Sequence, residues 1–216
     1  MSYWIKVVLA FTILAPAVAG AIRLKQIDRT YLPFLLMIGA GLLSETVSFI
    51  LIRKGLPNIN VINFYALAGS LLIVWQFRRW NIDAAYRHLF SALQVLLFLS
   101  WLVEALAIHR MNRVCSYFII GSSFFIVLLS IKTIASILFF EGSQLLKNPK
   151  FLVCVGFIIY FSFTILVEAF WVFGLSKSKE FRTSVYNLLY YVNAITNLIY
   201  FVSILWMPMR LRYIVR

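Results

Sequence analysis

Seven apolar stretches, each close to the length of a membrane-spanning helix, dominate this sequence. A bilayer core about 30 Å thick needs about 20 apolar residues per helix, and such stretches occupy almost the whole chain. The expected spans are 3–22, 31–52, 59–77, 89–109, 114–140, 151–175 and 183–207. The sequence therefore predicts an all-α polytopic membrane protein, with residues 1–216 forming a single seven-helix transmembrane domain with short loops.

The composition supports this prediction. Hydrophobic residues make up 63% of the chain and charged residues 12%, whereas soluble proteins average about 45–50% and about 25%. These values exclude a disordered chain, a disulfide scaffold and a soluble nucleotide-binding fold. The first span resembles a secretory signal in length, but Tyr3 and Trp4 precede Lys6, and Pro16 interrupts the apolar run. We therefore expect a retained helix.

The basic residues indicate an orientation in the membrane. The formal net charge is +13, and nearly all of the 20 lysines and arginines lie between the spans or near their ends instead of forming one patch. This distribution argues against a nucleic-acid partner. Eleven of them fall on the C-terminal side of the predicted bilayer and eight on the N-terminal side. Positive loops face the cytoplasm, so we expect the N-terminus outside, the C-terminus cytoplasmic, and anionic lipids bound at the basic inner face.

A weak internal repeat runs through the spans. Each even-numbered span carries one glutamate near its end, followed by a short loop and then a span that opens with tyrosine. Residues 65–70 (Tyr-Ala-Leu-Ala-Gly-Ser) match residues 117–122 (Tyr-Phe-Ile-Ile-Gly-Ser). This pattern predicts one lead helix followed by three helical-pair repeats. Chance similarity between apolar segments is the alternative explanation.

Three glutamates inside the spans are the strongest functional signal. Glu45, Glu104 and Glu168 lie on helices that run in the same direction, each roughly 8–10 Å from the helix end. Ionisable side chains in spans usually face a bundle interior or an aqueous cavity. Three neighbouring carboxylates need a counter-charge or a proton. The sequence therefore predicts a glutamate layer that binds a proton, a metal cation or a small cationic molecule.

Two polar stripes extend this predicted site. On the second span Gly41, Ser44, Glu45 and Ser48 share one helical face. The seventh span carries a longer stripe, formed by Tyr186, Tyr190, Asn193, Asn197 and Tyr200. The predicted ligand- or cation-binding residues are Glu45, Glu104, Glu168, Tyr186, Tyr190, Asn193 and Asn197.

Purely structural roles for these residues are the alternative interpretation. Each glutamate can instead accept a separate hydrogen bond between helices, with no shared cavity. For Tyr65 and Tyr117 we expect membership of the aromatic belt at the headgroup level.

No pattern of residues indicates catalysis. The sequence contains no nucleophile elbow, P-loop or zinc-protease motif. His88 and His109 fall on opposite sides of the membrane, and Cys115 and Cys154 lie in apolar runs. We therefore predict no enzyme activity, no cofactor and no metal site. Carboxylate catalysis on a lipid is the one enzymatic alternative.

Three functions fit these predictions. The first is binding, with or without translocation, of a proton, cation or small cationic molecule. The second is a seven-helix sensor or receptor that signals to a separate cytoplasmic protein. The third is a pore-forming or assembly component, including a homo-oligomer. A transporter needs a polar path through the whole bilayer, which Asn193, Asn197 and Gln76 suggest, whereas a sensor needs only the outer half.

Overall fold

The computed structural model of the chain describes residues 3–80, 87–108, 112–141, 145–173 and 179–209. Helices make up almost all of this part. They are α1 (Tyr3–Ala10), η1 (Phe11–Ile13), α2 (Leu14–Arg23), η2 (Arg29–Tyr31), α3 (Leu32–Arg53), α4 (Ile59–Trp80), α5 (Arg87–Leu102), the π-helical η4 (Val103–Ile108), α6 (Ser116–Glu141), η5 (Leu145–Lys147), α7 (Pro149–Val172) and α8 (Lys179–Trp206).

The seven predicted spans are confirmed. Seven helical segments of the described chain are long and apolar enough to cross a membrane, and their ends lie within three residues of the predicted ones. They are Trp4–Arg23, Arg29–Arg53, Ile59–Trp80, His88–Ile108, Ser116–Phe139, Pro149–Val172 and Ser184–Trp206. The predicted span ends at 109 and 175 fall outside the described residues. The chain is a multi-pass membrane protein; which side faces the cytoplasm stays a prediction.

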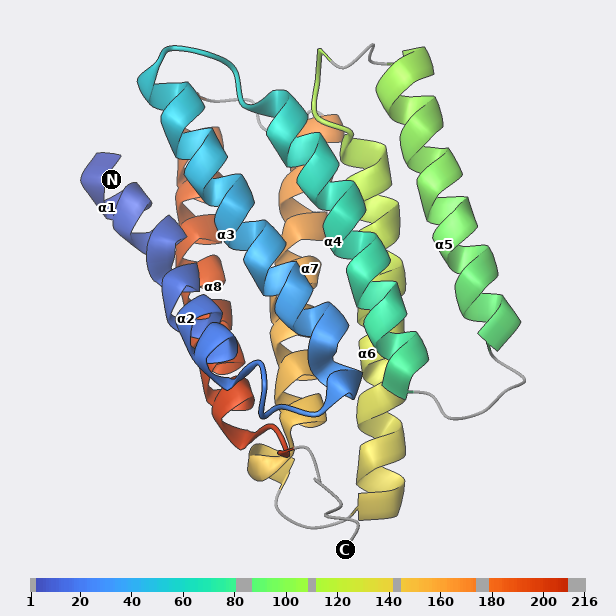
Figure 1. Cartoon of the computed structure of the whole chain (residues 1–216). Coiled ribbons are helices and arrows are strands. Elements are labelled where there is room, and N and C mark those ends of the chain that lie inside the picture. The colour runs from blue at the N-terminus through green and yellow to red at the C-terminus, as the bar shows by residue number, and fades with distance from the viewer. Residues whose placement is uncertain (1–2, 81–86, 109–111, 142–144, 174–178, 210–216) are drawn as a thin grey trace, which may run out of the picture.

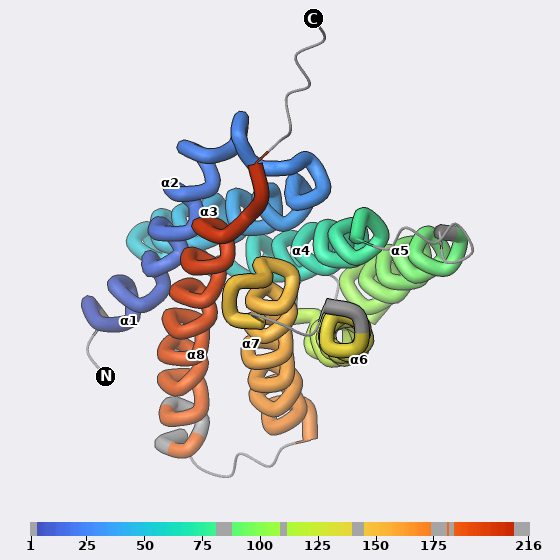
Figure 2. Tube along the Cα trace, turned by 90° about the horizontal axis from the view of Figure 1, so that it is seen from below, coloured from blue at the N-terminus to red at the C-terminus, as the bar shows by residue number. Residues whose placement is uncertain are grey.

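The helices form two rows. Figure 1 shows α3, α4 and α5 in front and α8, α7 and α6 behind them, and Figure 2 shows the same rows from below. The segment from α1 to α2 closes one edge by packing against α8 and α3. We call the side where α1 begins the N-side and the opposite side the C-side. The chain alternates between them, so α3, α5 and α7 end at the N-side.

Local sequence signals set the helix ends. The Asp28 carboxylate accepts a hydrogen bond from the Thr30 backbone N–H at 2.7 Å, ahead of α3. At the other end of α3, Gly55 adopts a positive φ of 72°. This left-handed conformation, which favours glycine, lets the Leu56 N–H reach the Leu51 carbonyl oxygen at 2.9 Å. The Asn148 side chain caps α7 in the same way as Asp28, with Pro149 in the first turn.

The first span is interrupted at its middle. Pro16 has no N–H to donate to the Thr12 carbonyl oxygen, and the turn just before it, η1, is a 3-10 helix. The Thr12 hydroxyl donates to the Leu9 carbonyl oxygen at 2.7 Å and accepts from the Asn197 side-chain amide at 2.9 Å. Residues of this turn therefore anchor the first span to α8.

The predicted helical pairs are packed unequally. The pairs α3–α4 and α7–α8 lie side by side, as the repeat predicts. By contrast, α5 packs mainly along α4, and α6 packs most extensively against α7. The middle pair of the repeat, α5 and α6, therefore makes few contacts along its length, because each helix buries its face against a neighbour outside the pair.

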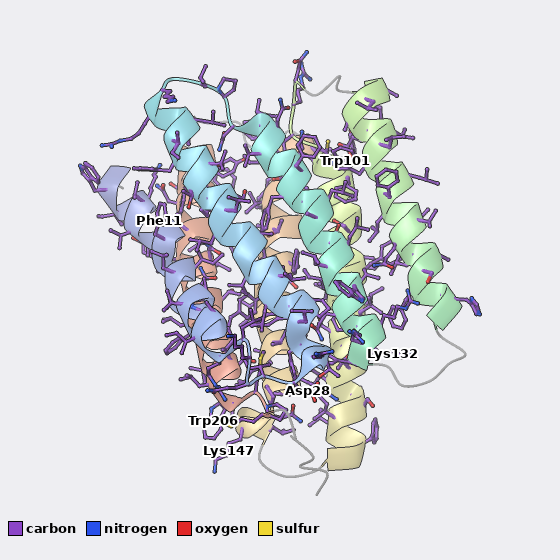
Figure 3. The ribbon with its side chains drawn as sticks, in the orientation of Figure 1. Phe11, Asp28, Trp101, Lys132, Lys147 and Trp206 are labelled. Atoms are coloured by element: carbon purple, nitrogen blue, oxygen red, sulfur yellow. The ribbon has the colours of Figure 1, made fainter. Side chains whose placement is uncertain are left out.

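Lys147 and Trp206 lie at the C-side end of the bundle (Figure 3). The Lys147 ammonium lies 5.8 Å from the centroid of the Trp206 ring. The Arg23 guanidinium donates hydrogen bonds to the carbonyl oxygens of Ile204 and Met207 and so caps the end of α8. Tryptophan and basic residues are typical of a membrane–water interface, so this end of the bundle fits the headgroup level.

Candidate functional site

A cavity with polar side chains on its wall lies between the two rows, in the N-side half. It has a volume of about 390 Å³ and is walled by α1, η1, α3, α4, α7 and α8. Towards the middle of the bundle it narrows to a recess of about 40 Å³. Both volumes are lined by Glu45, Tyr65, Tyr160 and Asn193, so they lie next to each other. We call the larger part the N-side cavity and the smaller part the recess.

The polar stripe of α3 forms one wall. Ser44, Glu45 and Ser48 line the N-side cavity, and Gly41 lines the recess one turn below Glu45. A Cβ atom at Gly41 would lie 2.7 Å from Ile13 Cδ1 and 3.1 Å from the Tyr65 hydroxyl oxygen. Glycine leaves room here for the Ile13 side chain and the Tyr65 hydroxyl, which both lie close to the α3 backbone. The prediction that this stripe faces the bundle interior is confirmed.

The polar stripe of α8 forms the opposite wall. Tyr186 and Tyr190 line the N-side cavity, Asn193 lines both parts, and Asn197 and Tyr200 line the recess. The stripe thus faces the interior, as its helical spacing predicts. The Asn197 amide is committed to the Thr12 hydroxyl, so it holds helices together as well as lining the recess. Whether these residues bind a ligand stays a prediction.

Glu45 is the only carboxylate that lines this cavity in the described chain, and it is half-buried. None of the described side chains donates a hydrogen bond to it or forms an ion pair with it. The Lys6 ammonium lines the same cavity from α1 and lies 6.0 Å from the centroid of the Tyr190 ring. The site therefore presents one acid and one base that do not contact each other.

The recess has room for water-sized molecules only. A single water needs roughly 10–15 Å³ of such space, so about 40 Å³ admits a few waters at most. The Thr196 hydroxyl lines the recess, is buried, and has no hydrogen-bond partner among the described residues. Buried polar groups nearly always have a partner, so a small polar occupant of the recess fits this hydroxyl.

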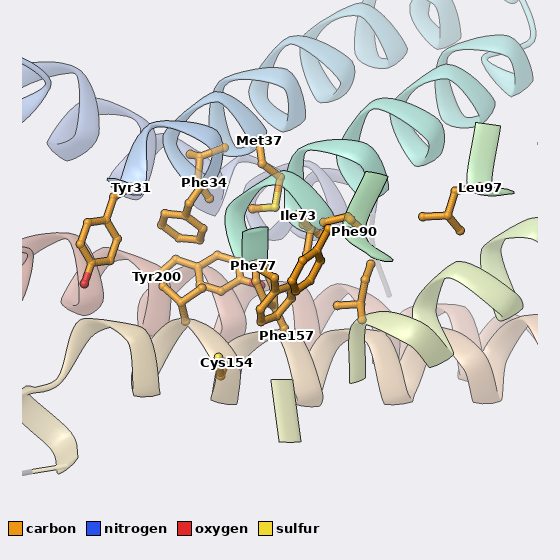
Figure 4. Close-up of a cluster of buried hydrophobic side chains, with 14 of the residues drawn as sticks. Tyr31, Phe34, Met37, Ile73, Phe77, Phe90, Leu97, Cys154, Phe157 and Tyr200 are labelled. Carbon is orange, nitrogen blue, oxygen red and sulfur yellow. The ribbon is translucent and has the colours of Figure 1, made fainter. Parts of the chain in front are cut away.

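An aromatic cluster closes the recess on its C-side (Figure 4). The Tyr200 ring lies edge-to-face against Phe34 and Phe157, with centroids 5.2 and 5.8 Å apart. Gly156 makes this packing possible, because a Cβ atom there would overlap the Tyr200 ring. Beyond the cluster, fully buried Gln76 is bonded to the backbone of Phe34 and Thr30. The predicted polar path through Gln76 is therefore interrupted in this conformation.

Glu104 has a different environment. Its side chain is 3% exposed, and its carboxylate accepts backbone N–H bonds from Tyr117 at 3.1 Å and Phe118 at 2.5 Å. These N–H groups belong to the first turn of α6, where helices leave donors unsatisfied and favour negative charge. Glu104 lies in the π-helical segment η4. It therefore fastens the end of the fourth span to the start of the fifth.

Glu168 lies at the same end of α6. Its carboxylate accepts a hydrogen bond from the Ser116 hydroxyl at 2.6 Å, and the backbone N–H of the next residue, Tyr117, donates to Glu104. The structure thus brings Glu104 and Glu168 together at α6, while Glu45 lines the N-side cavity. The described residues contain no group of three acids, histidines or cysteines suited to a metal ion. The expected common cavity for the three glutamates is not found.

A second polar junction lies beside Glu104. Asn63 is fully buried and donates to the Arg113 carbonyl oxygen at 2.9 Å, while its side-chain oxygen accepts from the Cys115 N–H at 3.0 Å. The Trp101 indole donates to the Asn63 carbonyl oxygen at 3.1 Å. Burial, together with the charge of Glu104, raises the pKa of the Cys115 thiol to about 11. The hydrogen bonds of Asn63 and Trp101 explain how α5 and α6 stay joined despite few contacts along their length.

Several residues of the cavity were not predicted from the sequence, among them Tyr160, Lys6 and Tyr65. Tyr160 and Lys6 were not assigned to it, and Tyr65 was expected in the aromatic belt, whereas the structure places all three on the cavity wall. Tyr160 lies four residues before Thr164 and eight before Glu168, so the helical spacing of α7 held a usable signal. Tyr117, by contrast, is 59% exposed near the N-side end of α6, as a belt residue should be.

Comparisons of the chain with protein-family models, with curated proteins and with solved structures find no match.

Proposed function

We propose that the protein binds a small molecule with a positively charged nitrogen in the N-side cavity, without a catalytic step. The observation that carries this proposal is the position of Glu45. Its half-buried carboxylate faces the cavity and makes no hydrogen bond or ion pair with the described residues. A charge that is partly removed from water gains most from a counter-charge. A ligand nitrogen beside Glu45 supplies one.

The walls of the cavity suit an organic cation. Tyr65, Tyr160, Tyr186 and Tyr190 all line it, and the faces of aromatic rings attract cations within about 6 Å. The Lys6 ammonium lies 6.0 Å from the Tyr190 ring centroid, so one wall already accommodates an amine. A volume of about 390 Å³ falls at the lower end of small-molecule pockets, which span about 300–1,000 Å³.

Closure of the recess towards the C-side favours binding and sensing over an open pore. The cluster of Phe34, Phe157 and Tyr200 and the buried Gln76 lie between the recess and the C-side. Translocation requires these aromatic rings to move. A sensor needs no such opening, and its output requires a separate cytoplasmic protein. We also propose that anionic lipids bind near the C-side, where Arg23, Lys147 and Trp206 lie.

The test is thermal unfolding of the purified protein in detergent with added cations. The panel contains potassium, tetramethylammonium and n-butylammonium, each as its chloride. A ligand that binds only the folded state raises the midpoint. We expect an organic ammonium to raise the midpoint of the wild type and of Glu168→Gln, the matched control, but not of Glu45→Gln. The proposal would be refuted if an organic ammonium still raised the midpoint of Glu45→Gln. It would also be refuted if no organic ammonium raised the midpoint of the wild type.

A further inference from the structure

We infer that the ligand of the N-side cavity is amphoteric, with its cationic nitrogen at Glu45 and an anionic group at Lys6. The inference rests on the proposed function and adds a substrate class to it. Both side chains line the same cavity, Lys6 from α1 and Glu45 from α3. Among the described residues that line the cavity, they are the one base and the one acid; the other titratable side chains on its wall are tyrosines.

The position of Lys6 is informative because a lysine near a helix end has an easier alternative. Lys6 is the third residue of the first span, and a lysine there can extend its ammonium to the aqueous interface. In the structure it is half-buried and lies over the Tyr190 ring, on the cavity wall. The side chain thus brings a positive charge into the cavity.

The charge balance selects the class of ligand. Lys6 and Glu45 do not form an ion pair with each other. The cavity wall therefore carries two separate charges of opposite sign, whose sum is zero. A simple cation would neutralise Glu45 and leave Lys6 as an uncompensated positive charge beside it, and an anion would do the reverse. Burying an unpaired charge is costly. A molecule with both an amine and a carboxylate or phosphate compensates both residues at once.

The polar groups around the two charges fit such a ligand. Ser44, Ser48, Asn58 and Asn193 line the cavity between the aromatic walls. Hydroxyl and amide groups donate to carboxylate oxygens and accept from ammonium groups. Among the described residues of the wall, none apart from Lys6 and Glu45 carries a charge that would repel either end of an amphoteric molecule.

The experiment measures dissociation constants for a matched series of probes. The series consists of ω-amino carboxylates with one to five carbons between amine and carboxylate, each with its primary amide and its deaminated acid. Binding to the purified protein is followed by calorimetry at neutral pH. We expect at least one amino carboxylate to bind at least tenfold more tightly than its amide, a difference of about 1.4 kcal/mol. The deaminated acids should bind more weakly than either.

Two variants assign the ends of the probe. Lys6→Met keeps the length and apolar character of the side chain without its charge, so it should reduce the preference over the amide to less than threefold. Glu45→Gln should weaken the amino carboxylate and the amide together. If the amide binds the wild type as tightly as the amino carboxylate, the amphoteric inference is wrong and the proposed function stands. If no amine in the series binds in a Glu45-dependent way, both fail.

A phosphatidylethanolamine headgroup has the same combination of charges as a free amphoteric molecule. The two sources are distinguished by repeating the titration in nanodiscs of phosphatidylglycerol, with and without added phosphatidylethanolamine. If a lipid headgroup is the native occupant, phosphatidylethanolamine should compete with the soluble probe in a manner that depends on Lys6 and Glu45. If the native occupant is water-soluble, the two nanodisc preparations should give the same dissociation constant.

Discussion

Replacing Gly156 with alanine should loosen the aromatic cluster that closes the recess. The new Cβ atom would overlap Cε1 of Tyr200 and lie 3.0 Å from Cδ1 and 3.2 Å from Cζ of the same ring. The ring has little room to retreat, because Phe34 and Phe157 pack edge-to-face against it with centroids 5.2 and 5.8 Å away. Overpacking of this kind costs about 1–3 kcal/mol.

Helix propensity acts in the opposite direction and has to be separated from the clash. Alanine is favoured over glycine within a helix by about 0.5–1 kcal/mol. Gly39 is the matched control, because it lies within α3 and a Cβ atom there meets nothing within 4 Å. Gly39→Ala should therefore show the propensity gain alone. The difference in unfolding free energy between the two variants should be the overpacking cost, about 1–3 kcal/mol.

The assay is SDS-induced unfolding of the purified protein, followed by circular dichroism. A double variant, Gly156→Ala with Tyr200→Leu, shows whether the ring causes the loss. Contacting residues couple by about 0.5–3 kcal/mol, so alanine should cost much less once the ring is removed. Equal stability of Gly156→Ala and Gly39→Ala, or an unchanged cost in the Tyr200→Leu background, would refute the packing described here.

Three further predictions concern the N-side end of the bundle and the orientation. Glu104→Ala should lower the unfolding free energy by about 1–3 kcal/mol, because two N–H groups of α6 lose their acceptor. Glu45→Ala should change the unfolding free energy by less than about 0.5 kcal/mol. Equal losses in the two variants would contradict the separate roles of the two glutamates. The Cys115 thiol, with its pKa raised to about 11, should resist maleimide at pH 8 in the folded protein, and the raised pKa should make stability fall as the pH rises from 9 towards 11; rapid labelling of native protein would argue against the burial. Leu56 and Leu146 are both exposed. A cysteine at position 56 should react with an impermeant thiol reagent added outside the cell, and a cysteine at position 146 should react only after lysis. The opposite pattern would invert the orientation.

The spans and the two stripes are the parts of this protein that its sequence reveals. A helix that crosses lipid needs about 20 apolar residues, and such runs can be recognised directly in the sequence. The predicted ends of all seven spans therefore lie within three residues of the observed ends. The stripes on α3 and α8 were equally accessible, since polar groups that face lipid cost free energy. Helical spacing alone was therefore enough to predict that Glu45 and Asn193 face the interior of the bundle.

The assignment of the glutamates needed information that the sequence does not contain. Equal depth suggested one shared cavity, but depth says nothing about position around the bundle. The structure places α5 beside α4 and α6 beside α7, which takes Glu104 and Glu168 to the first turn of α6. Lys6 was read as part of the charge pattern of the loops, because only the packing of α1 against α8 shows that it lines a cavity.

The most direct test of the central claim is the reaction of a cysteine at Ser48 with charged thiol reagents. Ser48 lines the N-side cavity one turn from Glu45, while Cys115 and Cys154 are fully buried and give little background. The measurement is the rate constant of a trimethylammonium methanethiosulfonate with Ser48→Cys, with and without Glu45→Gln, and with Leu56→Cys as the loop control. Neighbouring positions on a helix lie about 6 Å apart, and unit charges at that distance interact by about 0.7 kcal/mol even in bulk water. Loss of the Glu45 charge should therefore slow the reaction at position 48 by at least about threefold and leave position 56 unchanged. An unreactive cysteine at position 48, or a rate that does not depend on Glu45, would contradict a cation-binding cavity.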